Sequence, residues 1–240
     1  MNELNTSRNP DPRLVGKTSQ VSDSRKIDQE AMQFAQLMNA SSPSASNHCK
    51  FKETDKLLVV SVDDLDSHPQ KMKQLTDYLR TSGIPATLFP HSRANPEVLN
   101  SMSQLPNTKL GWHGTAPGKL DNPPQAGVDK TVIAWSHGED YEGRERRLGS
   151  NEVARGTRSD GQFRINEFDQ HNIPSFTINN DEPSIFLEQR KKDVLSNGGL
   201  LSYHLHNSTG LKTLSSTVNE FRKNDGKIVH LSELKGCGKY

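Results

Sequence analysis

The chain has 240 residues, of which 31% are hydrophobic, and 30 basic against 29 acidic side chains leave a net charge of +1. A chain so close to neutral is not expected to be a strongly electropositive nucleic-acid binder. No run approaches the roughly 20 apolar residues that a membrane span requires. The N-terminus also lacks the apolar segment of a Sec-type signal peptide, so a cytoplasmic location is the default expectation.

Residues 1–50 are rich in serine and asparagine and contain one aromatic residue, Phe34. This composition buries too little apolar surface to offset chain entropy, and it predicts a disordered tail. Within the tail, residues 26–38 place apolar side chains three and four positions apart, which predicts a short amphipathic helix. The helix is either transient in a free tail or docked on the domain or a partner. A polar tail of this kind is also typical of substrates of specialised, type III-like secretion systems, which makes export the alternative to a cytoplasmic location.

Residues 51–240 are expected to form one α/β domain, because short apolar runs alternate with amphipathic stretches. The predicted strands are 57–62, 84–90, 108–114, 130–138, 173–179, 198–207 and 227–234. The predicted helices are 69–83, 95–105, 164–172, 184–197 and 211–225. Strands that alternate with helices imply right-handed crossovers and a parallel sheet.

Ionisable side chains follow the predicted strands at their C-terminal ends, where parallel α/β folds gather their working residues. They are Asp63, Asp64, His113, Arg155, Asp160, Asp181, His204 and His206. Adjacent carboxylates at the end of a buried strand are costly unless a cation or hydrogen bonds stabilise them. The spacing fits a metal ligand beside a free base, and it also fits a solvated pair or a helix N-cap. His204 and His206 fall on one side of their strand, so a joint site is expected there.

The ordered series of motifs resembles the polysaccharide deacetylases of carbohydrate esterase family 4, over about residues 56–236. The segments that carry the resemblance are 61–65 with its Asp-Asp pair, 83–89, 111–117, 155–161 and 198–204. The resemblance implies a deformed (β/α) barrel and a metal-dependent hydrolase. Such an enzyme removes N-acetyl groups from a chitin-type or peptidoglycan-type glycan.

The resemblance also implies roles for individual residues. Asp64 and His113 match ligands of a divalent metal ion, most often zinc. Asp63 matches the general base that deprotonates the attacking water, and Arg155 matches the residue that orients this base. His204 matches the general acid that protonates the leaving amine.

Three positions depart from the family pattern: Pro117 replaces the second metal histidine, Leu65 replaces a glycine, and residues 179–183 lack the expected Trp. Two ligands alone hold zinc weakly, so another residue must complete the site or the metal is lost. His68 is the predicted third ligand, and His206 and His137 are the other candidates.

Substrate binding is assigned to Trp112, Asp181 and His206. The alternative function is a catalytically impaired barrel that binds a glycan or a protein, as a secreted effector for example. The presence of the acid, the base and the orienting residue together favours the enzyme. The absence of the second metal-binding histidine, which Pro117 replaces, favours the binding module. The sequence does not predict the oligomeric state.

Cys49 and Cys237 flank the predicted domain. Two cysteines cannot form a disulfide framework or a four-cysteine zinc site. Two free thiols are the default expectation, and a disulfide forms only if the two ends of the domain meet.

Overall fold

The computed structural model describes residues 49–64, 69–91, 94–114, 127–135, 148–156, 170–178, 184–206 and 210–238. They all belong to the unit Pro43–Tyr240. The predicted tail and its helix at 26–38 lie outside these residues, as do His68, His137, Asp160 and Asp181, so those expectations stay predictions. No helix in the described ranges is long and apolar enough to cross a membrane.

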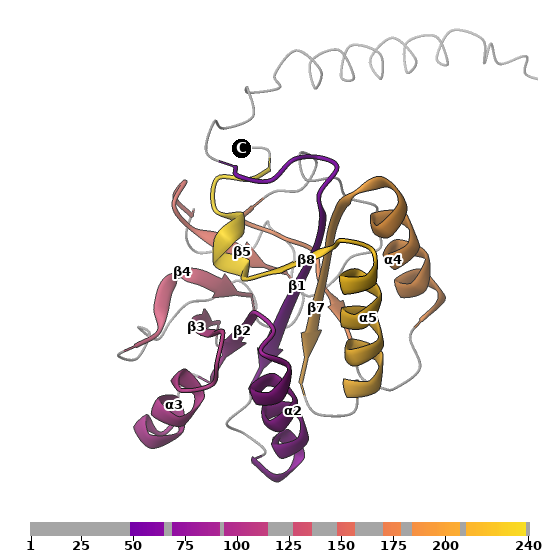
Figure 1. Cartoon of the computed structure of the whole chain (residues 1–240). Coiled ribbons are helices and arrows are strands. Elements are labelled where there is room, and N and C mark those ends of the chain that lie inside the picture. The colour runs from indigo at the N-terminus through magenta and orange to yellow at the C-terminus, as the bar shows by residue number, and fades with distance from the viewer. Residues whose placement is uncertain are drawn as a thin grey trace, which may run out of the picture. The chain divides into compact units, whose positions relative to one another are not determined.

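One curled parallel sheet of eight strands forms the centre of the unit (Figure 1), in the order β5-β4-β3-β2-β1-β7-β6 with β8 beside β1. The strands are β1 (Lys56–Asp63), β2 (Ala86–Phe89), β3 (Thr108–His113), β4 (Asp129–Ala134), β5 (Val153–Arg155), β6 (Phe176–Thr177), β7 (Gly199–Leu205) and β8 (Lys227–Val229). The sheet curves into a half-barrel. The predicted parallel α/β class is therefore confirmed, while a complete barrel of the deacetylase type is not seen in the described residues.

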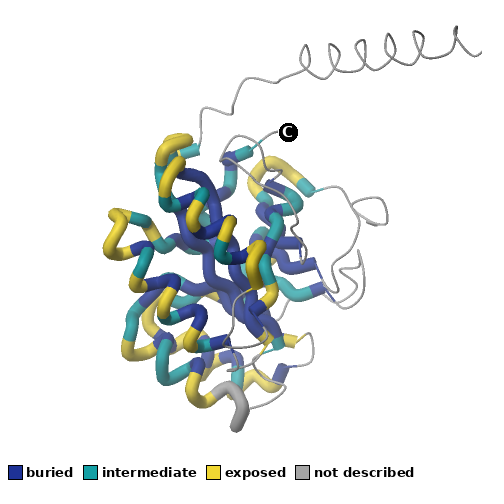
Figure 2. The backbone as a smooth tube through the Cα atoms, turned by 90° about the vertical axis from the view of Figure 1, so that its right-hand side faces the viewer, coloured by how far each residue is buried: buried dark blue, intermediate teal, exposed yellow. Residues whose placement is uncertain are grey.

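Four α-helices are described: α2 (Pro69–Ser82), α3 (Pro96–Ser103), α4 (Ile185–Asn197) and α5 (Leu211–Lys223). Local sequence accounts for the starts of α3 and α4. The Asn95 side chain accepts a hydrogen bond from the Glu97 amide at the start of α3, and the Ser184 side chain accepts one from the Leu187 amide at the start of α4. Both are favoured N-cap residues. Figure 2 shows that burial is concentrated in the central strands and that exposure is concentrated in the turns and on the outer sides of the helices.

The two faces of the sheet carry two separate apolar clusters, and the alternation of side chains along each strand sorts residues between them. In β1, Leu58, Val60 and Val62 belong to the cluster formed with the helices, whereas Leu57 and Val59 belong to the cluster on the concave face. The same alternation places the side chains of Ser61 and Asp63 on the concave face. The curvature of the sheet therefore surrounds Asp63 with the neighbouring strand ends.

Two predicted strands are shorter than expected. The strand predicted at 227–234 ends at Val229, because residues Leu231–Leu234 form a 3-10 helix, η3, in which Glu233 caps the backbone N–H of His230. This 3-10 helix buries Leu231 and Leu234, three positions apart, in the concave cluster. The strand predicted at 173–179 is reduced to a bridge at Ile173 and the two residues of β6, since Pro174 has no N–H for a continuous ladder.

The expectation of two free thiols was wrong, because Cys49 and Cys237 form a disulfide. Cys237 is buried in the concave cluster, and Cys49 and Phe51 pack against that cluster. The two ends of the described domain therefore meet. Lys50 and Glu233 form an ion pair beside the disulfide.

Candidate functional site

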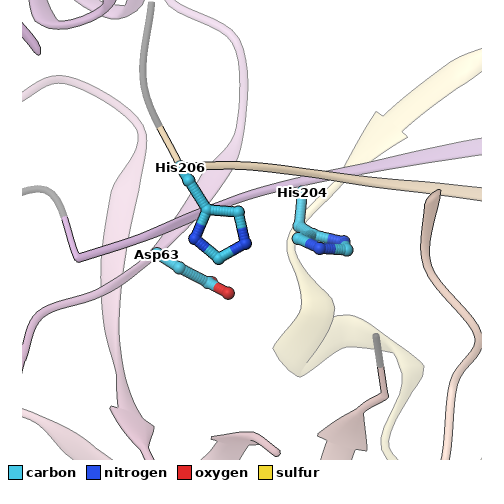
Figure 3. A group of neighbouring side chains, drawn as sticks. All are labelled: Asp63, His204 and His206. Atoms are coloured by element: carbon cyan, nitrogen blue, oxygen red, sulfur yellow. The ribbon is translucent and has the colours of Figure 1, made fainter. Parts of the chain in front are cut away.

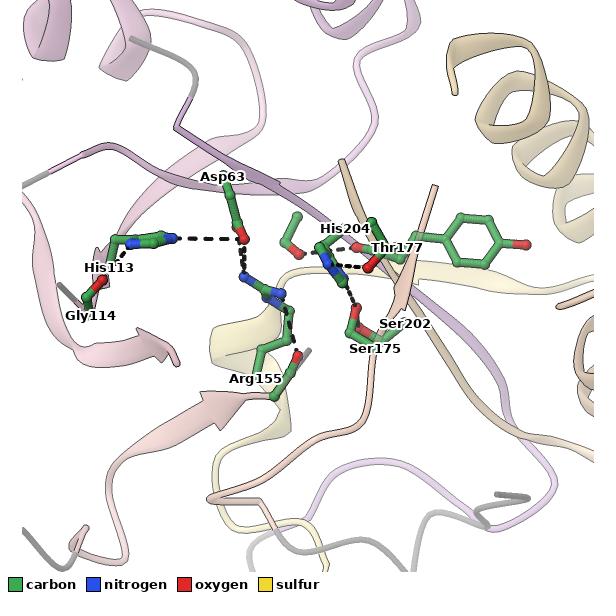
Figure 4. A network of polar contacts seen from close by, with 11 residues as sticks. Asp63, His113, Gly114, Arg155, Ser175, Thr177, Ser202 and His204 are labelled. Carbon is green, nitrogen blue, oxygen red and sulfur yellow. Dashed lines mark hydrogen bonds and ion pairs between the residues drawn. The ribbon is translucent and has the colours of Figure 1, made fainter. Parts of the chain in front are cut away.

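The carboxylate of Asp63 is held by cationic and imidazole groups from strands far apart in sequence (Figure 4). Nη2 of Arg155, at the end of β5, lies 2.6 Å from both carboxylate oxygens of Asp63 and donates hydrogen bonds to them. Nε2 of His113, at the end of β3, lies 3.7 Å from Oδ2 of Asp63. Asp63 and Arg155 are fully buried. The expectation that Arg155 orients Asp63 therefore has the required geometry.

Electrostatics keep Asp63 ionised despite its burial. Burial alone raises the pKa of this carboxyl group, but the charge of Arg155 and the nearby imidazole of His113 outweigh it. The net effect holds the pKa of Asp63 well below its usual range. Asp63 is therefore ionised in the folded protein near neutral pH.

His113 is fixed in one orientation by its backbone partner. Its Nδ1 lies 2.7 Å from the carbonyl oxygen of Gly114, which can only accept a hydrogen bond, so Nδ1 carries a proton and donates it. Burial lowers the pKa of His113, but the nearby negative charge of Asp63 outweighs burial and raises it. Nε2 thus lies toward the Asp63 carboxylate and can take a proton or a cation, as it does in metal-ligating histidines.

Asp64 is a strained residue with an unpaired oxygen. Its backbone N–H donates to the carbonyl of Phe89, and its φ of 50° lies in the left-handed region that few residues other than glycine adopt. Its Oδ1 atom is buried and has no hydrogen-bond partner among the described residues. A buried carboxylate oxygen without a partner is costly. A cation would satisfy this oxygen, and the assignment of Asp64 and His113 as metal ligands stays a prediction.

His204, on β7, lies beside the hydroxyl groups of Thr177 on β6 and of Ser175, which directly precedes β6. Its Nε2 is 2.7 Å from Oγ1 of Thr177, and its Nδ1 is 3.1 Å from Oγ of Ser175, which also accepts from Oγ of Ser202 at 3.1 Å. Burial lowers the pKa of His204 well below its usual value, and the charge of Arg155 lowers it further. His204 is therefore neutral at rest.

His206 is exposed and follows the end of β7, close to His204. The two imidazole centroids are 5.3 Å apart in an edge-on arrangement. Ligand atoms of Asp63, His204 and His206 all lie within 4.8 Å of one another (Figure 3). The expectation that the two imidazoles lie close together is confirmed, and a joint function for them stays a prediction.

Trp112 does not join this group. It precedes His113 in β3, so alternation turns it to the other side of the sheet, where it packs against the cluster of Ile133, Trp135 and Ala154. Its assignment to substrate binding stays a prediction, as does the assignment of Asp181.

The sequence argument missed the hydroxyl groups around His204. Ser202 is two positions before His204 in the same strand and shares its face, so period-two alternation could have identified it. Ser175 and Thr177 reach His204 only through the pairing of β6 with β7, in which Thr177 stands opposite His204. That pairing has no local sequence signal.

Comparisons with known proteins leave the family open. No family model, no curated protein and no solved structure matches the chain. The resemblance to polysaccharide deacetylases therefore rests on the sequence motifs alone.

Proposed function

We propose that the protein is a metal-dependent hydrolase that removes N-acetyl groups from an amino-sugar polymer or oligomer of the chitin or peptidoglycan type, on a barrel of the polysaccharide deacetylase type. The observation that carries the proposal is the buried Asp63 carboxylate held between Arg155 and His113, with His204 close by. Buried charges weaken folding unless they are well paired. Clusters of ionisable groups with shifted pKa values at the C-terminal ends of strands are typical of catalytic sites.

Asp64 and His113 would hold the divalent metal ion, for which zinc is the first choice. The unpaired Oδ1 of Asp64 and the fixed Nδ1–H of His113 support this assignment. Bound there, the ion would polarise the amide carbonyl and lower the pKa of the attacking water. His68 remains the predicted third ligand, on a segment outside the described residues.

Asp63, Arg155 and His204 would move the protons. Asp63 accepts the proton of the attacking water, and Arg155 keeps its carboxylate in place. Once protonated, the Asp63 carboxyl group would release that proton readily to solvent in the site because its pKa is lowered, and the neutral His204 would take up a proton there. An imidazolium with a lowered pKa is a strong acid, so His204 then protonates the leaving nitrogen. Thr177 and Ser175 fix the orientation of its ring.

Release of acetate from chitooligosaccharides and from acetylated peptidoglycan fragments tests the proposal. Asp63→Asn is expected to lower the rate by about 10²–10⁴-fold, the usual contribution of a general base. Asp77→Asn, on the exposed side of α2, is the matched control and should leave the rate unchanged. Absence of acetate release from both substrates by folded, zinc-supplied protein would contradict the proposal.

One observation favours a binding module instead: the position of the second metal histidine is Pro117, which cannot coordinate a metal. A module of this kind would bind chitooligosaccharides or a protein partner without turnover, and it would contain no metal after purification. Calorimetric binding without acetate release would favour it over the enzyme.

We also propose that the protein works outside the cell, as an exported protein. The Cys49–Cys237 disulfide supports this, because disulfides persist in oxidising surroundings and are rare in the cytosol. Detection of the oxidised protein in culture supernatant, and its absence from the cell pellet, would test the location.

A further inference from the structure

A second group of metal-binding side chains lies beside the Asp64–His113 pair. Asp63, His204 and His206 bring one carboxylate and two imidazoles within 4.8 Å of one another. The pairing of β1 with β7 explains their proximity. Val62 stands opposite Leu205 in that ladder, so the next positions on the two strands, Asp63 and His206, come side by side.

We propose that Asp63, His204 and His206 bind a second, inhibitory zinc ion. This inference rests on the proposed function, because the ion would occupy the base and the acid of the hydrolase at once. Two imidazoles and one carboxylate are a donor set that zinc commonly takes in proteins, with the fourth position left to water. The site is distinct from Asp64 and His113.

Supporting contacts are already in place. Oγ of Ser175 holds one nitrogen of His204 and is itself held by Ser202, as outer partners hold a metal-binding imidazole. The other nitrogen of His204 bonds to the exposed Thr177, whose hydroxyl group can turn to solvent when an ion arrives. His206 is exposed and gives the ion a route from solvent.

The guanidinium group of Arg155 makes this site the weaker one. It lies 2.6 Å from the Asp63 oxygens, so it neutralises the carboxylate and repels a cation that approaches it. The Asp64–His113 site should therefore fill first and the triad only at higher zinc. Acetate release should rise with added zinc and then fall.

Calorimetric titration of the full chain with zinc tests the inference without reference to activity. Wild-type protein is expected to bind zinc at two sites of unequal affinity. His206→Ala should weaken the lower-affinity site at least about tenfold, since loss of an outer-shell partner alone costs about 10–100-fold. Asp64→Asn should remove the tighter site and keep the weaker one. His91→Ala, an exposed histidine outside the triad, is the matched control and should titrate like wild type.

Zinc binding by His206→Ala that equals wild type would overturn the inference, and so would a single zinc ion lost in both His206→Ala and Asp64→Asn. Failure of the proposed function looks different. In that case no acetate is released at any zinc concentration, while the zinc titration still separates the His206-dependent site.

Discussion

Arg155 is a fully buried cation whose carboxylate partner, Asp63, is equally buried, and this pair determines the electrostatics of the whole strand-end site. Two charges removed from water are stable only while they face each other. The pair leaves Nε of Arg155 without a hydrogen-bond partner in the described part of the chain, which is a further cost. Burial of Arg155 therefore lowers the stability of the fold. Its position at the C-terminal ends of the strands is better explained by a functional role than by a contribution to folding.

Removal of the cation alone should therefore be strongly destabilising. Arg155→Met leaves a buried, unpaired carboxylate and is expected to lower the free energy of unfolding by about 3–5 kcal/mol, measured by urea denaturation. The double variant Asp63→Asn/Arg155→Met should recover part of that loss. Arg80→Met, whose partner Asp77 is exposed, is the control and should cost less than about 1 kcal/mol. Equal effects of the two single variants would contradict the account.

At this scale the sequence predicted much of the site. Asp63, His113 and His204 each follow or end a predicted strand, and strand ends meet at one edge of a parallel sheet. The strand that ends at Arg155, β5, was not among the predicted strands. The position of His206 beside Asp63 was less predictable. That His206 lies beside Asp63 depends on the register of β1 against β7, which no local pattern of apolar residues specifies.

The register of β1 and β7 is set at the other end of the strands, where α4 turns into β7. Gly198 has a φ of 82°, and a Cβ atom there would lie 2.6 Å from the carbonyl oxygen of Glu53. The next amide, of Gly199, donates to the carbonyl of Asp55 at 2.8 Å, one residue before β1 begins. Close approach at this turn thus aligns the strands that carry Asp63 and His204.

Replacement of Gly198 by alanine should lower the free energy of unfolding, because the backbone around residue 53 lies too close to Gly198 for a Cβ atom. Gly127 is the matched control, because its φ of 88° is similar but a Cβ atom would meet nothing within 4 Å. Gly127→Ala should cost about 1–2 kcal/mol for its backbone conformation alone. Gly198→Ala should cost about 1–3 kcal/mol more, because the added carbon forces the turn apart. Denaturant unfolding measures both, and indistinguishable losses would show that the turn is not closely packed.

Glu233 gives the β8–η3 junction a dependence on pH. Burial raises the pKa of Glu233, but the hydrogen bonds from Lys50 and from the His230 amide outweigh it and lower the pKa. Because the folded pKa lies below that of the unfolded chain, about 4.3, the stabilisation is complete above that value and is lost as the pH falls through the folded pKa.

The stability difference between wild type and Glu233→Gln should therefore be largest near pH 7 and should shrink below about pH 4. Urea denaturation at three pH values measures it, with the exposed Glu97→Gln as the control for the change of charge. If the difference in unfolding free energy between wild type and Glu233→Gln grew as the pH fell, the lowered pKa of Glu233 would be contradicted.

At the scale of the whole molecule, a single disulfide joins the two ends of the domain across 188 positions. Composition could not predict it, since two cysteines are as compatible with free thiols as with a bridge. The bridge depends on where the chain places Cys49 against Cys237, and η3, which brings Cys237 into the concave cluster, was itself predicted as strand. The parallel sheet, in contrast, followed from the alternation of elements.

Removal of the bridge should weaken the fold without changing the site. Cys49→Ala/Cys237→Ala is expected to lose about 2–5 kcal/mol of unfolding free energy. The native protein, denatured without reductant, should show no free thiol, and two should appear after reduction. Two thiols before reduction, in protein purified under oxidising conditions, would contradict the structure.

The central claim is that the strand ends hold a metal ion beside an acid and a base. Anomalous diffraction at the zinc edge, from crystals of the full chain supplied with one equivalent of zinc, tests it most directly. The account predicts one strong peak in contact with Asp64 and His113, with Asp63 and His204 in their present places. A peak elsewhere, or none in a map that shows these side chains clearly, would contradict it.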